Sequence, residues 1–210
     1  MVYLNEIESQ RLSTLLAKVQ SRLKALYFAL LVHAGERYRR LRDKSELEIA
    51  EQIIPKLREY DPNNYQCKLS AAMAAFTLRR DIQSAKEEIA ACGHEKESAW
   101  RYGEAFLFLY EGELENAYHS YKRAFRAPTD ITVPNQSEEF IQIVLEEEPD
   151  RVWLYYGLGL INSRVKMDLG AARRDFKAFI NSADPKCFHK HIAFAETWLS
   201  EIDEPLERSA

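Results

Sequence analysis

The sequence predicts an all-α protein built from antiparallel helical hairpins, and three observations support that fold class. Gly and Pro are scarce, with 7 of each among 210 residues, whereas a sheet-rich chain needs turn residues roughly every 8–12 residues. Apolar residues recur with helical spacing along the chain. Hydrophobic residues make up 46% and charged residues 30% of the sequence, a composition typical of a folded domain.

The hairpins are predicted from a pattern that occurs four times. An apolar residue is followed after three positions by Ala, after four more by an apolar residue, and after three more by another. This spacing describes one apolar stripe on a helix, and the recurring Ala indicates a second helix in close contact. The copies are Leu47-Ala50-Ile54-Leu57, Ile82-Ala85-Ile89-Cys92, Leu114-Ala117-Tyr121-Ala124 and Leu169-Ala172-Phe176-Phe179.

The segment from Gly112 to Pro128 resembles the second half of a tetratricopeptide repeat (TPR), with Gly and an acidic residue at the inter-helix turn and a closing Pro. Pro cannot continue a helix, and Asp61-Pro62 and Asp184-Pro185 close two other copies. Leu158-Gly159 is similar to the Leu-Gly pair of the family's first helix, with one extra residue in the following turn. The resemblance covers roughly residues 31–182. It implies a right-handed solenoid of TPR-like hairpins with N- and C-terminal capping helices.

The expected segments follow from these copies. An N-terminal helix over 1–30 precedes three hairpins over 31–128, an insertion over 129–150, a fourth hairpin over 151–183, and a capping helix with a tail over 184–210. In the insertion, residues 129–135 are expected to be extended, and Ser137 is expected to cap a helix. That helix either packs across the solenoid or moves and covers its groove. The hairpin count predicts roughly eight to eleven helices.

Six apolar residues near the N-terminus recur at alternating steps of four and three, which is heptad spacing. They are Leu12, Leu16, Val19, Leu23, Leu26 and Leu30. This helix either caps the first hairpin or joins two copies of the chain. Residues 1–44 hold nine Lys/Arg against four Asp/Glu, a net charge of +5, which leaves −9 for the rest. The basic segment is either the solvated face of a long helix or a surface for an acidic partner or a phosphate backbone.

Motifs for catalysis and cofactor binding are absent from the sequence. It has no phosphate-binding loop, metalloprotease motif, nucleophile elbow or Cys-x-x-Cys pair. Gly157-Leu158-Gly159 lies in a helical stretch, where contact between helices explains it. Cys187 and His191 share a helix face but His189 points away, so a zinc site is not expected. We therefore expect no enzyme activity, no cofactor and no bound metal.

The compartment is also predicted. Three widely spaced cysteines do not form a disulfide framework, and the residues after Met1 do not form a secretory signal. The longest apolar run, Ala25 to Ala34, is shorter than the roughly 20 residues of a membrane span. A cytoplasmic protein without a membrane span is expected. A nucleic-acid partner is not expected, since no nucleic-acid motif surrounds the basic residues.

In TPR-like arrays the first helices of the hairpins line a concave groove that holds a peptide or a partner helix. The repeat match places in this groove Arg39, Arg42, Ser70, Tyr102, Phe106, Tyr110, Trp153, Tyr156 and Arg164. Aromatic and Arg side chains anchor many interfaces. The resemblance thus implies a protein- or peptide-binding scaffold or adaptor whose partner combines acidic and apolar side chains. Two alternatives stay open. In the first, the aromatic residues are part of the core instead of the groove. In the second, the chain is a homo-oligomeric structural or regulatory protein, for example a homodimer that associates through the heptad helix.

Overall fold

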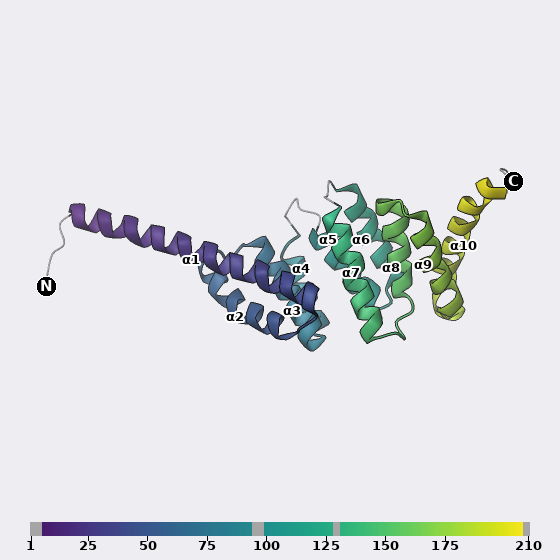
Figure 1. Cartoon of the computed structure of the whole chain (residues 1–210), viewed down its shortest axis with the longest axis horizontal. Helices are drawn as coiled ribbons and strands as arrows, with labels where there is room; N and C mark the ends of the chain where they lie inside the picture. Colours follow the sequence, from purple (N-terminus) through teal and green to yellow (C-terminus); the bar gives the residue numbers. More distant parts are fainter. Residues whose placement is uncertain (1–5, 94–98, 128–130, 208–210) are drawn as a thin grey trace. The chain divides into compact units, whose positions relative to one another are not determined.

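The computed structural model describes residues 6–93, 99–127 and 131–207, and Figure 1 shows them as helices joined by short connections. These residues contain ten α-helices and one π-helical segment and no strand, so the predicted all-α class and the predicted number of helices are confirmed. The chain divides into two compact units, residues 1–95 and 96–210. Each unit is described by itself.

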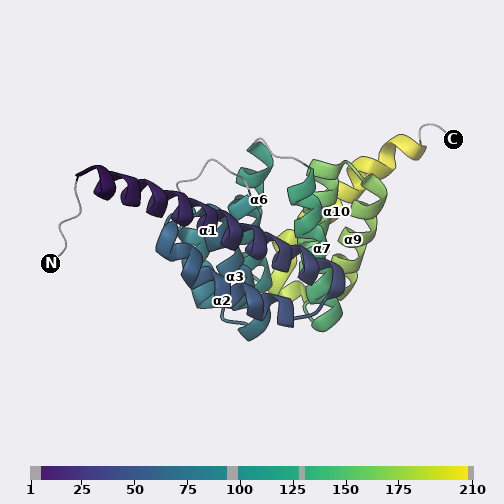
Figure 2. The same ribbon diagram turned by 60° about the vertical axis from the view of Figure 1, so that its left-hand side comes forward.

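Unit 1 consists of two helical hairpins. The first pairs α1 (Glu6–Leu41) with α2 (Ser45–Tyr60), and the second pairs α3 (Tyr65–Arg79) with α4 (Ile82–Ala90). Helix α2 also packs against α3. The core between the hairpins is apolar and comprises Leu31, Ala34, Ala50, Ile53, Ile54, Leu57 and Cys67. Figures 1 and 2 both show the N-terminal part of α1 running beyond α2, α3 and α4.

Side-chain caps start several of these helices. The Asn64 side chain accepts a hydrogen bond from the Cys67 backbone N–H at 2.9 Å, and Asp81 accepts one from Ser84 at 3.0 Å. Asp168 does the same for Ala171 at 2.9 Å in unit 2. Such caps satisfy backbone donors that have no partner within the helix. The positions where these three helices begin are therefore encoded locally.

Unit 2 contains the remaining helices. Helix α5 (Ala99–Tyr110) pairs with α6 (Leu114–Arg126), and α8 (Leu154–Ile161) pairs with α9 (Leu169–Ser182). Helix α7 (Thr132–Glu147) packs against both α5 and α8, and α10 (Pro185–Glu207) packs against α9. Neighbouring helices in each unit are thus paired, as the repeated pattern predicted.

Small residues lie where helices touch. The four repeated alanines, Ala50, Ala85, Ala117 and Ala172, are at most 1% exposed, and each lies on the second helix of its pair. A Cβ on Gly157 would collide with Leu109 of α5, and one on Gly159 would lie 2.5 to 2.8 Å from ring atoms of Phe176 of α9. The helix contact predicted for these two glycines is therefore confirmed.

The extra residue expected after Leu158-Gly159 coincides with an irregular turn. Helix α8 continues into a π-helical segment, η1 (Asn162–Lys166), in which the wider turn holds one more residue than an α-helical turn. The Asp168 N–H donates to the Asn162 carbonyl at 3.0 Å and closes this segment. The irregularity in the sequence pattern thus has a local structural counterpart.

Three predicted boundaries differ from the structure. Residues 131–135 are not extended, because α7 already begins at Thr132; residues 129 and 130 lie outside the described residues. Pro134 falls in the first turn of α7, where a missing N–H breaks no helical hydrogen bond, so Ser137 is not the cap. At the N-terminus, α1 runs without a break past residue 30 and serves as the first helix of a hairpin. At the C-terminus, α10 continues to Glu207, into the expected tail.

Candidate protein-binding surface

The predicted groove residues of α5 are buried inside unit 2. Tyr102, Phe106 and Tyr110 are at most 4% exposed. The Tyr102 ring meets that of Tyr121 of α6 at 6.2 Å, and burial raises the pKa of its hydroxyl to about 12. The Phe106 ring meets that of Phe140 of α7 at 4.9 Å. These contacts favour the alternative that the aromatic residues of α5 are core.

The groove residues expected around α8 divide between core and surface. Tyr156 is 1% exposed and packs against the rings of Phe176 and Phe179 of α9, at centroid distances of 6.2 and 5.3 Å. Trp153 is half-buried just before α8, and its indole N–H donates to the Tyr110 carbonyl at 3.4 Å. Arg164 is exposed within η1.

The remaining predicted groove residues belong to unit 1. Arg39 is half-buried in the last turn of α1, and Arg42 is exposed just after it with φ of +59°. Ser70 is half-buried on α3. The basic part of the predicted site, apart from Arg164, is therefore in one unit and its aromatic part in the other.

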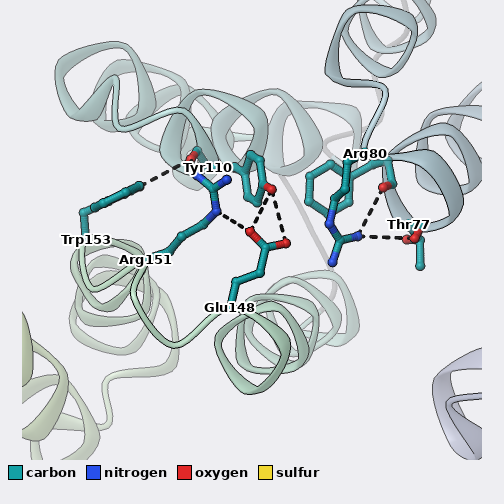
Figure 3. Close-up of polar contacts among 7 residues, drawn as sticks. Thr77, Arg80, Tyr110, Glu148, Arg151 and Trp153 are labelled. Atoms are coloured by element: carbon teal, nitrogen blue, oxygen red, sulfur yellow. Dashed lines mark hydrogen bonds and ion pairs between the residues drawn. The ribbon is translucent and has the colours of Figure 1, made fainter.

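Helix α7 and Glu148, which follows it directly, cover the part of the predicted groove that Phe106 and Tyr110 form on α5. A polar cluster fastens the C-terminal end of α7, as Figure 3 shows. Glu148 accepts a hydrogen bond from the Tyr110 hydroxyl at 2.8 Å and one from the Arg151 guanidinium at 2.5 Å. The Arg151 guanidinium lies 3.6 Å from the centre of the Tyr110 ring and donates to the Tyr110 carbonyl at 2.8 Å. Of the two alternatives for the insertion, this packing favours a fixed helix.

Figure 3 also shows a cap in unit 1. Arg80 follows α3 in the left-handed region, with φ of +53°, and its guanidinium donates to the carbonyls of Phe76 and Thr77 at 3.2 and 3.3 Å. Its guanidinium carbon lies 4.7 Å from the centre of the Phe76 ring. These bonds satisfy carbonyls at the helix end, so the role of Arg80 in unit 1 is structural.

An exposed apolar face on α1 is the feature of the described chain best suited to binding. Every side chain from Glu8 to Arg22 is exposed. Five apolar side chains on one side of α1 are between 50% and 59% exposed: Leu12, Leu15, Leu16, Val19 and Leu26. With 3.6 residues per turn they lie within roughly a third of the helix circumference, over a length of about 21 Å. We call this surface the α1 apolar face.

The C-terminal half of α1 turns a different side to the core. Leu31, Ala34 and Tyr38 are buried against unit 1, whereas Leu26 and Leu30 remain exposed. The rings of Tyr27 and Tyr60 stack at 6.1 Å, and Lys24 forms an ion pair with Asp61 at 2.8 Å. The predicted heptad seam therefore points partly away from the α2 contact. Sequence reasoning found this seam but missed Leu15, which widens it.

The two edges of the α1 apolar face differ in charge. At 100° per residue, Arg11, Lys18 and Arg22 follow one edge, all exposed and without an ion pair to the described residues. The other edge carries Ser13 and Gln20, which are uncharged. The face is thus a narrow apolar strip with positive charge on one side.

Titratable side chains lie close together at two places in the described part of unit 2. Glu115 lies 3.0 Å from His119 and 3.6 Å from His191, and burial lowers the pKa of His191. Cys187 is exposed near Asp184. Among the described residues no group of three His, Cys, Asp or Glu side chains is placed to hold a metal ion. In both units, no helix formed by the described residues has the length and apolarity to cross a lipid bilayer.

Comparison with known proteins gives no relative: no family model, no curated protein and no solved structure matches this chain.

Proposed function

We propose that this chain is a non-enzymatic protein-binding scaffold of helical hairpins that engages a helical partner through the α1 apolar face. The observation that carries the proposal is the set of apolar side chains, each at least half exposed, on one side of a projecting helix. Contiguous exposed apolar surface marks binding sites in folded proteins. The resemblance of the hairpins to TPR units supports a binding role at the level of fold alone.

The structure favours α1 over the groove predicted from the repeats. In unit 2 other helices bury the aromatic groove residues: Phe106 contacts Phe140 of α7, Tyr110 contacts Glu148 directly after α7, and Tyr156 contacts Phe179 of α9. A ligand there would have to displace a helix whose residues Ile141 and Val144 are at most 1% exposed. Removing so much apolar surface from its packing is costly. The α1 apolar face requires no such rearrangement.

The spacing of the face favours a helix as its partner. Leu12, Leu16, Val19 and Leu26 fall on heptad positions, and a narrow strip of this kind fits the side chains of a second helix. A membrane surface instead takes a wider apolar face with basic residues around the polar side. Along the α1 apolar face the basic residues without an ion pair to the described residues, Arg11, Lys18 and Arg22, follow one edge, and Lys24 on the other side is paired with Asp61.

The test compares two double variants of the intact chain. Leu12→Asp with Leu16→Asp places two charges in the apolar face, and Thr14→Asp with Ser21→Asp places the same charges on the opposite side of the same helix. Both pairs are exposed, so both variants should retain the helix content of the parent. Partners are captured from cells on each tagged protein, and the solution mass of each is measured by light scattering.

We expect the apolar-face variant to lose a partner that the control variant and the parent retain. Burying a Leu side chain in an interface contributes about 1.5–3 kcal/mol, and an unpaired charge in its place is costly to bury, so two charges should abolish binding. Equal capture by both variants, with an unchanged solution mass, would refute the proposal. A parent that is a dimer, converted to a monomer by the apolar-face variant alone, would identify the partner as a second copy.

A further inference from the structure

We infer that the partner of the α1 apolar face is an amphipathic helix of another protein that carries acidic side chains along one edge of its apolar seam. This inference rests on the proposed function and adds the chemistry of the partner. Its basis is the unequal charge of the two edges of the face. An interface commonly places opposite charges around its apolar centre, because these orient the partner and exclude wrong ones.

The basic edge is formed by three side chains at helical spacing. Arg11, Lys18 and Arg22 are separated by seven and four residues and lie on one side of α1. They are exposed and make no ion pair with the described residues, whereas Lys24, on the other side, is paired with Asp61 at 2.8 Å. Long basic side chains can lie along apolar surface and extend their charge to a neighbour. A partner helix seated on Leu15 and Val19 would place its own edge within their reach.

A second copy of the chain fits this charge pattern poorly. Two parallel α1 helices would place the basic edge of one against the uncharged edge, with Ser13 and Gln20, of the other. Two antiparallel helices would place basic edge against basic edge. Glu8 is the acidic side chain nearest this edge in the described part of α1, and it could face Arg22 of the second copy. Arg11 would then lie near Lys18 of that copy, so repulsion would offset the gain.

The distribution of charge along the chain agrees with this partner. Residues 1–44 have a net charge of +5 and the remainder −9; four of the nine basic residues of this segment lie along the α1 apolar face, and the other five lie between Arg37 and Lys44. Concentrated charge of one sign speeds the association of a partner of the other sign. The geometry points to a heptad helix with Glu or Asp along one edge.

The experiment uses two synthetic heptad peptides as probes. Both have a Leu seam; one carries Glu and the other Lys along the edge that would face Arg11, Lys18 and Arg22. Binding to the full chain is measured by fluorescence anisotropy at low and high salt. We expect the Glu peptide to bind about tenfold more tightly at low salt, because each exposed ion pair contributes a factor of roughly 1.4 to 5. The preference should shrink as salt screens the charges.

A charge-reversed protein supplies the second arm. Arg11→Glu with Arg22→Glu should reverse the preference toward the Lys peptide. Lys122→Glu with Lys177→Glu makes the same change in net charge on exposed positions of unit 2 and should leave the preference unchanged. Circular dichroism of each variant checks that the helices remain. A misfolded protein would not gain affinity for the Lys peptide, so tighter binding of that peptide by Arg11→Glu with Arg22→Glu cannot result from misfolding.

The outcomes separate this inference from the proposed function. Equal affinity for both peptides, stronger binding to anionic lipid vesicles than to the Glu peptide, or a parent protein that is a dimer would overturn the inference. The proposed function would survive equal affinity for the two peptides, or a dimeric parent, if Leu12→Asp with Leu16→Asp still abolished binding. Unchanged binding by that variant would overturn both.

Discussion

Gly159 offers the sharpest test of how the helices of unit 2 pack. A Cβ at this position would lie 2.5 to 2.8 Å from three ring atoms of Phe176. The ring is fully buried, and the rings of Trp198, Tyr156 and Phe194 surround it at centroid distances of 5.0, 6.2 and 6.4 Å. Because these neighbours leave the ring no space to move into, Gly159→Ala must separate α8 from α9.

Two opposing effects determine the size of the loss. Overpacking a buried contact by one methyl group costs about 1–3 kcal/mol, and three short contacts with an enclosed ring place this substitution near the upper end. Replacing Gly by Ala inside a helix gains about 0.8–1.0 kcal/mol. The net loss in the free energy of unfolding should therefore be about 2 kcal/mol.

The assay is urea unfolding followed by tryptophan fluorescence. Trp100, Trp153 and Trp198 all belong to unit 2, so the signal reports that unit. Gly170→Ala is the matched control: the position is exposed on α9, and Oδ1 of Asp168 would lie 3.5 Å from the new Cβ. This substitution should raise the free energy of unfolding by up to about 1 kcal/mol. If the two variants shift stability in the same direction and by the same amount, the close contact of α8 with α9 is refuted.

Three further predictions concern the repeat, the insertion and pH. Ala117→Leu should cost about 1–3 kcal/mol by overpacking the α5–α6 contact; a variant as stable as the parent in the same urea assay would show that the repeat register is misplaced. Glu148→Ala should speed hydrogen exchange across α7 and cost roughly 1–2 kcal/mol of stability, since the Tyr110 hydroxyl loses this acceptor and Arg151 loses one of its two. Glu146→Ala, at an exposed site in the last turn of α7, should do neither. Burial lowers the pKa of His191 below 6.5, so the unfolded state binds the proton more readily than the folded state. Stability should therefore fall as the pH decreases through about 6.5, and it should level off below the pKa of His191 in the folded state. His191→Gln should weaken that fall below about pH 6.5; an unchanged pH dependence would exclude His191 as its source.

Local chemistry made the hairpins of this chain predictable. The alanines at 50, 85, 117 and 172 occupy contacts that only a small side chain permits, and Gly157 and Gly159 lie where a Cβ would collide with a neighbouring helix. Such requirements are visible in the sequence because they restrict residue type at one position. Asp81 and Asp168 likewise mark helix starts through their own hydrogen bonds.

The neighbour against which a face packs was not predictable in this way. Tyr102, Phe106 and Tyr110 share one side of α5, as their spacing indicated, but the sequence does not say whether a ligand or a helix covers that side. The answer depends on α7, whose start was misplaced because Ile131, Thr132 and Val133 favour strands. Tertiary packing and the tolerance of the first helical turn for Pro134 outweighed that propensity.

The projecting part of α1 leads to a last prediction, because its helix lacks the packing that stabilises the others. Most helical stability in proteins comes from tertiary contacts, and isolated helices of this length are marginal in water. The segment from Glu8 to Arg22 has only exposed side chains, while Leu31, Ala34 and Tyr38 anchor the rest of the helix. Since the anchored turns supply a nucleus, helix should persist next to them and fray toward the N-terminus.

Hydrogen exchange followed by NMR measures this gradient residue by residue. In the free chain, amides before Arg22 should exchange far faster than those from Leu31 to Tyr38, with protection falling steadily toward the N-terminus. Binding of a partner helix to the α1 apolar face should raise protection over Leu12 to Val19 and leave α9 unchanged, because only the first segment gains contacts. Uniform protection along α1 in the free monomer would contradict this reasoning, since a helix with that stability would need contacts that the described residues do not provide.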